Sequence, residues 1–222
     1  MNLDNNGLRG TLPSEIQTLL ALEDFELPRN SLEGPLSADL AMLSQLKSLN
    51  LEDNSLVGNP WSTLTMLPML TSLRVSQNSL SGELPISIGQ LLDMENLCIA
   101  SNMFEGTIPT QISQLSALES LLISENFFTG TLPSELAQLD LKFLQAQDNH
   151  FNGTVPIEIF GVEELQVLHL GQNMFSGELH PDLGNLINLV DLRLEKNQFQ
   201  GDLPFTFFLL NKLRKSQCCF LF

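Results

Sequence analysis

Few side chains in this sequence are suited to catalysis or to metal binding. The 222 residues include three histidines and three cysteines: His150, His169, His180, Cys98, Cys218 and Cys219. Such groups act as bases, nucleophiles or zinc ligands when several of them converge. Here the histidines fall in a loop, on a strand and on an outer segment of the repeats, so they do not converge, and no cysteine has zinc-ligand spacing. Because a phosphate-cradling glycine loop and a nucleophile elbow are also missing, the sequence predicts no enzyme, no metal site and no cofactor.

The charge of the chain argues against a second class of function. Its formal net charge is −16 at pH 7, and a nucleic-acid-binding protein needs a basic face to neutralise phosphates. Half of the ten basic residues lie near the C-terminus, and we interpret them as part of a solvent-exposed chain end. They are Arg193, Lys196, Lys212, Arg214 and Lys215. We therefore expect no nucleic-acid partner.

One polar residue type does recur at a fixed spacing. An asparagine appears every 24 residues, with a single step of 23, and a glycine follows each one four positions later. The nine asparagines are Asn6, Asn30, Asn54, Asn78, Asn102, Asn126, Asn149, Asn173 and Asn197. A period of this length indicates a solenoid, in which stacked repeats bury a continuous core between neighbours.

The elements that must position these asparagines can be read from one complete copy, residues 118–139, LESLLISENFFTGTLPSELAQL. Its L-x-x-L-x-I segment alternates as a short strand with one buried face, so the copies predict a parallel sheet. The asparagine amide follows where the chain turns and can donate to and accept from the backbone of adjacent turns. Nine in register predict a structural hydrogen-bonded ladder, with short helical or irregular turns on the opposite face.

A second column of the repeat changes its residue type halfway along the chain. Two positions after each asparagine stands a leucine in the first four repeats and a phenylalanine in the last five, from Phe104 to Phe199. Stacked aromatic rings bury more area per repeat, so we expect the C-terminal half to be the more stable one.

The same pattern sets the domain boundaries. Residues 1–210 form one domain of nine repeats of 23–24 residues, and residues 211–222 read as a truncated repeat or a C-terminal tail. The first repeat lacks the leucines that should precede it, so we expect its outer face to be bare. Cys218 and Cys219 read as incidental small apolar residues of the tail, and lipidation beside Lys212 and Lys215 is the alternative.

The pattern L-x-x-L-x-L-x-x-N-x-L/F-x-G-x-I/L-P resembles that of plant-type leucine-rich repeats, and it covers nearly the whole chain. It is similar to the ectodomains of receptor-like kinases and receptor-like proteins, and to polygalacturonase-inhibiting proteins. The resemblance implies an α/β solenoid: a right-handed superhelix with a parallel β-sheet on its concave face, which binds peptides, steroids, co-receptor domains or foreign enzymes. The cysteine-containing caps of those ectodomains, their membrane span and a kinase domain are not found in this sequence.

A candidate binding surface follows from the strand positions six, four, two and one residues before each asparagine, which alternation directs away from the core. In the middle repeats several of these positions are apolar, and polar residues flank them. An exposed apolar patch with a polar rim is typical of protein-binding sites, although single apolar residues scatter over any surface. The candidate residues are Cys98, Leu122, Phe143, Gln145, Val167, His169 and Arg193.

These observations favour a recognition module for a protein or peptide ligand, as part of a receptor-like or inhibitor-like protein in signalling or defence. The alternative is a structural or vestigial repeat fragment without its own ligand. Extracellular or membrane-associated location is implied by the resemblance alone, because the sequence shows no signal peptide and no transmembrane run, so membrane attachment would require segments outside it. Asn152 begins a sequon that would be glycosylated on secretion, or is simply an ordinary repeat position. The oligomeric state stays open.

Overall fold

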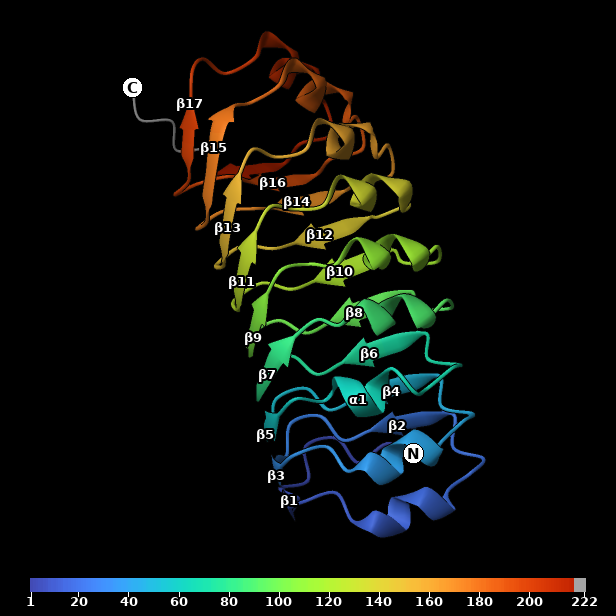
Figure 1. Cartoon of the computed structure of the whole chain (residues 1–222). Coiled ribbons are helices and arrows are strands. Elements are labelled where there is room, and N and C mark those ends of the chain that lie inside the picture. The colour runs from blue at the N-terminus through green and yellow to red at the C-terminus, as the bar shows by residue number, and fades with distance from the viewer. Residues whose placement is uncertain (218–222) are drawn as a thin grey trace.

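A computed structural model describes residues 1–217 and shows a single stack of coils that rises from the N-terminus to the C-terminus (Figure 1). Each coil carries one strand on the concave face, one strand on the adjoining side and one short helical turn on the outer face. The predicted fold class, a leucine-rich-repeat solenoid with a parallel sheet opposite short turns, is confirmed.

The concave sheet has nine parallel strands in chain order. They are β2 (Asp24–Glu26), β4 (Ser48–Asn50), β6 (Ser72–Arg74), β8 (Asn96–Cys98), β10 (Ser120–Leu122), β12 (Phe143–Gln145), β14 (Val167–His169), β16 (Asp191–Arg193) and β18 (Lys215–Gln217). The last of these belongs to the segment after the ninth repeat, where Asp191 pairs with Lys215 in the same register as the preceding strands.

A second parallel sheet, which the sequence pattern did not reveal, runs along the adjoining side. Its strands are β1 (Arg9–Gly10), β3 (Ser31–Gly34), β5 (Ser55–Gly58), β7 (Ser79–Glu83), β9 (Met103–Gly106), β11 (Phe127–Gly130), β13 (His150–Gly153), β15 (Met174–Glu178) and β17 (Gln198–Gln200). All of these strands except β17, which stops one residue before Gly201, end at or just beyond the repeat glycine, which has a positive φ, for example +75° at Gly130. Glycine is required there because side-chain-bearing residues rarely adopt this conformation.

The outer face carries one short helix in each repeat. They are η1 (Ser14–Thr18), η2 (Ala38–Met42), α1 (Trp61–Leu64), η3 (Ile86–Gln90), η4 (Thr110–Gln114), η5 (Ser134–Gln138), η6 (Ile157–Gly161), η7 (Pro181–Asn185) and η8 (Phe205–Leu209). The repeat proline precedes most of these turns, as Pro133 precedes η5. Where the proline is replaced, a side chain caps the turn instead: Ser37 Oγ and His180 Nδ1 each accept a hydrogen bond from the backbone N–H two residues later. His180 therefore has a structural role.

The concave strands are shorter than the alternation pattern predicted. The eight strands from β2 to β16 each span only the positions six to four residues before the asparagine. The residue directly before the asparagine has a positive φ of 51–56°, as at Glu125 and Lys196. The positions two and one before each asparagine therefore lie beyond the strand, and the expectation that they continue it is wrong.

The asparagine amides join successive turns in the core. Nδ2 of Asn126 donates to the backbone oxygens of Ile123 and Ser124 in its own repeat and to that of Ile99 in the preceding one. Its Oδ1 accepts from the backbone N–H of Phe104. The same pattern recurs through Asn197, whereas Asn6 at the exposed end donates only to Asp4 of its own repeat.

The phenylalanine column forms a continuous stack beside this ladder. Its five buried or half-buried rings run from Phe104 to Phe199 with successive centroids 6.1–6.5 Å apart. Trp61 extends the stack, since α1 places its indole 5.2 Å from the ring of Phe104. The irregular third repeat, where the short turn becomes a true α-helix, thus joins the aromatic column to the leucine-filled N-terminal half.

Candidate functional site

The candidate residues form two rows on the concave face. Strand pairing places five of them side by side in one row, one from each strand between β8 and β16: Cys98, Leu122, Gln145, His169 and Arg193. Phe143 pairs with Val167 in the neighbouring row. The sheet therefore brings residues that are 23–24 positions apart in the sequence into direct lateral register.

The exposure of these residues separates them into two groups. Phe143 is 36% exposed, and Leu122, Gln145, Val167 and Arg193 are partly exposed. Cys98 and His169 are only 2% and 6% exposed, so the expectation that they face solvent is wrong. Longer neighbours explain the burial of Cys98, because the strand register places it between Arg74 and Leu122. The accessible surface is thus the strip Leu122–Phe143–Val167 with polar residues beside it, and its role in partner binding stays a prediction.

Burial also decides the chemistry of Cys98. Desolvation raises the pKa of its thiol to about 11, although the nearby guanidinium of Arg74 works against this shift. A thiol with that pKa is protonated at neutral pH and is a poor nucleophile. Cys218 and Cys219 lie outside the described residues.

A cluster of charged groups surrounds His169. Its Nε2 atom lies 3.2 Å from Oδ2 of Asp191 on β16, although the two atoms are not aligned for a hydrogen bond. Nη2 of Arg193 lies 3.5 Å from the same oxygen. Burial lowers the pKa of His169, the Asp191 carboxylate opposes this shift, and the Arg193 guanidinium adds to it. The imidazole is therefore neutral at pH 7.

One further feature of this cluster was not predicted from the sequence. Gly171 occupies the position two before Asn173, where most other repeats place a larger side chain, and the Glu195 carboxylate of the next repeat lies over it. A Cβ atom at Gly171 would be 2.6 Å from Oε1 of Glu195. The glycine thus allows that carboxylate to approach the sheet. The signal available in the sequence was that Gly171 is a glycine at a position where the other repeats have a residue with a side chain.

The remaining candidates do not join this cluster. His150 lies on β13 in the second sheet, where its ring is 6.0 Å from that of the exposed Phe127. Asn152 is exposed on the same strand, and its glycosylation stays a prediction. Within residues 1–217, no group of three histidine, cysteine or carboxylate side chains is arranged to hold a metal ion.

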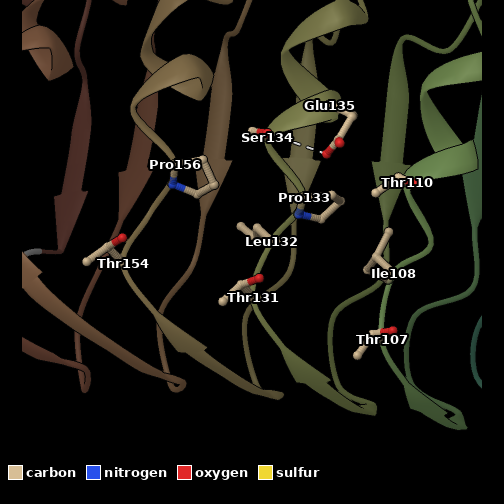
Figure 2. Close-up of a pocket in the computed structure, with 10 residues that line it drawn as sticks. All are labelled: Thr107, Ile108, Thr110, Thr131, Leu132, Pro133, Ser134, Glu135, Thr154 and Pro156. Atoms are coloured by element: carbon tan, nitrogen blue, oxygen red, sulfur yellow. Dashed lines mark hydrogen bonds between the residues drawn. The ribbon is translucent and has the colours of Figure 1, made fainter.

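A shallow groove of about 530 Å³ lies away from the concave face, between the second sheet and the outer turns (Figure 2). Figure 2 shows that equivalent residues of three successive repeats line it, including Thr107, Thr131 and Thr154. Its one ionisable side chain, Glu135, accepts a hydrogen bond from the hydroxyl of Ser134. The groove follows from the repeat geometry and offers no converging reactive groups.

Comparisons with known proteins agree with this architecture. The family model described as Leucine Rich Repeat matches residues 69–91, 117–139 and 164–186. No curated protein sequence matches the chain. Among solved structures, the Arabidopsis receptor kinase HAESA in complex with the peptide hormone IDA and the co-receptor SERK1 is 32% identical, with a TM-score of 0.91. That match covers 96% of this chain and 36% of HAESA.

Two other structures are informative. The ectodomain of the membrane receptor kinase GASSHO1/SCHENGEN3 from Arabidopsis thaliana, in complex with CASPARIAN STRIP INTEGRITY FACTOR 2, is 32% identical with a TM-score of 0.83. The match covers 96% of this chain and 29% of that one. A plant ice-binding protein is 25% identical with a TM-score of 0.75, over 92% of this chain and 74% of that one. The chain thus spans about a third of the receptor ectodomains that it matches. None of the helices within residues 1–217 has the length and apolar character needed to span a bilayer.

Proposed function

Because the chain is a leucine-rich-repeat protein whose structure matches the ectodomains of plant receptor kinases, we propose that it is a recognition module for a peptide or protein ligand. The module acts without catalysis, as part of a receptor-like or inhibitor-like protein in signalling or defence. An extracellular or membrane-associated location belongs to the same proposal, since GASSHO1/SCHENGEN3, one of the similar chains, is a receptor ectodomain.

The observation that carries the proposal is the apolar strip on the concave face. Leu122, Phe143 and Val167 come from three adjacent strands, and all three are at least partly exposed. Apolar residues gathered on one open face, with Gln145 and Arg193 beside them, are typical of a protein-binding surface. The structures of HAESA and GASSHO1/SCHENGEN3 each contain a bound partner, which makes a peptide the first ligand to test.

Selection from a random dodecapeptide phage library against the purified 222-residue chain tests the proposal. The double variant Phe143→Ser/Val167→Ser should weaken the binding of selected peptides at least tenfold, because it removes the apolar anchors. A matched control, Val57→Ser/Phe127→Ser, removes two exposed apolar side chains from the second sheet and should leave the affinity unchanged. Unchanged affinity in the concave-face variant would refute the proposal.

The alternative function, a structural or vestigial repeat fragment, makes a different prediction. A fragment without a ligand should yield no selected peptides, and its unprotected first repeat should fray before the rest of the stack melts. Leu3, Leu8 and Leu19 of that repeat are exposed, which is the observation in favour of this alternative. Absence of enrichment together with a non-cooperative melt would support it.

A further inference from the structure

The concave face between β12 and β16 contains an unusual concentration of polar atoms that lack partners. Within residues 1–217, five buried side-chain nitrogen or oxygen atoms make no hydrogen bond, and four of them belong to the concave strands or to the segments that directly follow those strands in three consecutive repeats. These four are Gln147 Oε1, His169 Nε2, Asp191 Oδ1 and Glu195 Oε2. Since buried polar atoms are nearly always paired, this cluster requires an explanation.

The chemistry of the four atoms specifies what would satisfy them. Three are oxygens that accept hydrogen bonds, and two of these belong to carboxylates. His169 is more than nine-tenths buried, and its Nε2 atom lies 3.2 Å from Oδ2 of Asp191 without the alignment of a hydrogen bond. A group that donates several hydrogen bonds and carries positive charge would therefore be complementary to this cluster.

The cations of the chain itself do not fill this role. Nζ of Lys196 is bound to Oε1 of Gln172 at 2.7 Å, one repeat away. Arg193 approaches only Oδ2 of Asp191 and leaves Oδ1 unpaired. The acceptor atoms of Gln147 and Glu195, which belong to repeats two steps apart in the stack, thus stay without a donor in the described part of the chain.

The surroundings favour the side chain of a peptide over a small free cation. Phe143 and Val167 lie beside the cluster, on the same strands as Gln145 and His169, and offer apolar surface to an aliphatic stem. The aromatic face of Phe143 can also attract a cation. The net charge of −16 would draw a basic ligand toward the molecule.

We propose that this cluster binds a cationic side chain of the ligand, with arginine preferred over lysine because its planar fork presents five donors. This inference rests on the proposed function, which supplies the assumption that the ligand is a peptide. Glu195 and Gln147 are partly exposed although their unpaired acceptor atoms are buried, so binding of the guanidinium requires both side chains to rotate toward it. Gly171 has a specific part in this site, since it makes the space in which the Glu195 carboxylate lies.

A pair of small probes tests the site without a selected peptide. N-acetyl-arginine methylamide and its neutral analogue N-acetyl-citrulline methylamide would be titrated into the whole chain, with the His169 imidazole resonances followed by NMR. The His169→Gln variant assigns these resonances among the three histidines. We expect a saturable shift of the His169 resonances with the arginine probe. The dissociation constant of the citrulline probe should be about tenfold larger, because citrulline lacks the charge. Equal binding of the two probes would overturn the proposal.

Three variants separate the site from the net charge of the protein. Glu195→Gln removes one acceptor charge, and Gly171→Ala displaces the same carboxylate while every charge is kept. Both should lower the arginine affinity about fivefold or more. Glu178→Gln, an exposed residue of β15, removes the same charge from the second sheet and should have no effect. An equal loss in Glu178→Gln would mean that only net charge matters and would refute the site.

The outcome is distinguishable from a failure of the proposed function. Selected peptides that bind the concave face but contain no basic residue would overturn the cation site and leave peptide binding standing. Specific arginine binding without any selected peptide would support the site and count against the peptide-binding function.

Discussion

Nε2 of His169 lies 3.2 Å from Oδ2 of Asp191, although strand pairing places Asp191 opposite Val167 and not opposite His169. The contact is therefore diagonal, between neighbouring strands of the concave sheet. It places a buried imidazole beside a carboxylate on the concave face.

The burial of His169 predicts a loss of stability on mild acidification. Burial lowers the pKa of this histidine below its ordinary value of about 6.5, so in the intervening pH range the unfolded chain binds a proton that the folded chain excludes. Stability should decrease as the pH falls from 6.5 through the pKa of the folded state.

Urea unfolding between about pH 7.5 and 5.5 measures this effect, and His169→Gln should show the weaker dependence. The carboxyl of Asp4 provides a separate marker. Its pKa is lowered by the ion pair with Arg29, so its contribution is lost only at more acidic pH. Identical pH profiles for the wild-type chain and His169→Gln would rule out the histidine as the cause.

The asparagine ladder predicts a large difference between the middle and the end of the stack. Asn126→Ala would remove three donated hydrogen bonds and leave the backbone N–H of Phe104 unpaired in the core. The free energy of unfolding should fall by about 3 kcal/mol. Asn6→Ala at the exposed end should cost less than about 1 kcal/mol. Urea denaturation of both variants compares them, and equal losses would contradict the ladder.

Adjacent phenylalanines provide a matched test of the aromatic stack. Phe128 is fully buried between two stacked rings, whereas Phe127 is 48% exposed on the second sheet. Phe128→Leu should destabilise the fold by about 1–2 kcal/mol through lost area and ring contacts. Phe127→Leu should stay within about 0.5 kcal/mol of wild type. Thermal melts followed by circular dichroism distinguish the two, and the reverse order would refute the stacking argument.

The repeat glycine predicts strain on substitution. Gly130 has a φ of +75°, and a Cβ there would lie 2.9 Å from Cγ2 of Thr107. Gly130→Ala should therefore cost about 1–2 kcal/mol. Gly161 has no atom within 4 Å of an added Cβ, so Gly161→Ala should be close to neutral. Chemical denaturation of both proteins tests the prediction, which fails if Gly161→Ala proves the more damaging change.

The buried thiol of Cys98 predicts slow alkylation. Its pKa of about 11 leaves roughly one thiolate in a thousand at pH 8. A Cys218→Ser/Cys219→Ser variant retains Cys98 as the single thiol and allows iodoacetamide labelling to be followed by mass spectrometry. Labelling should be slow in buffer and rapid in urea. Equally rapid labelling in both conditions would show that the thiol is accessible in the folded protein.

Much of the fold could be predicted because every repeat of a solenoid places its turns and its buried residues at the same positions. The spacing of Asn126 and Gly130 set where each coil turns, and the alternation of Leu192 and Leu194 set which face is buried. Each repeat packs only on its neighbours, so a pattern 24 residues long contains most of the information that the stack needs. The second sheet was not foreseen, because its strands span only two to five residues, which is too short for an alternating pattern to be recognised.

The sequence by itself therefore determined the repeat, the asparagine and phenylalanine columns and the face of the sheet on which the candidate residues lie. Only the tertiary structure decided that Cys98 and His169 are buried on that face and that Glu195 extends over Gly171. These facts depend on side chains about 24 residues apart, whose lengths and orientations compete for the same space above the sheet. The pattern within one repeat does not predict which of these side chains is buried, because they contact one another only when the strands lie side by side.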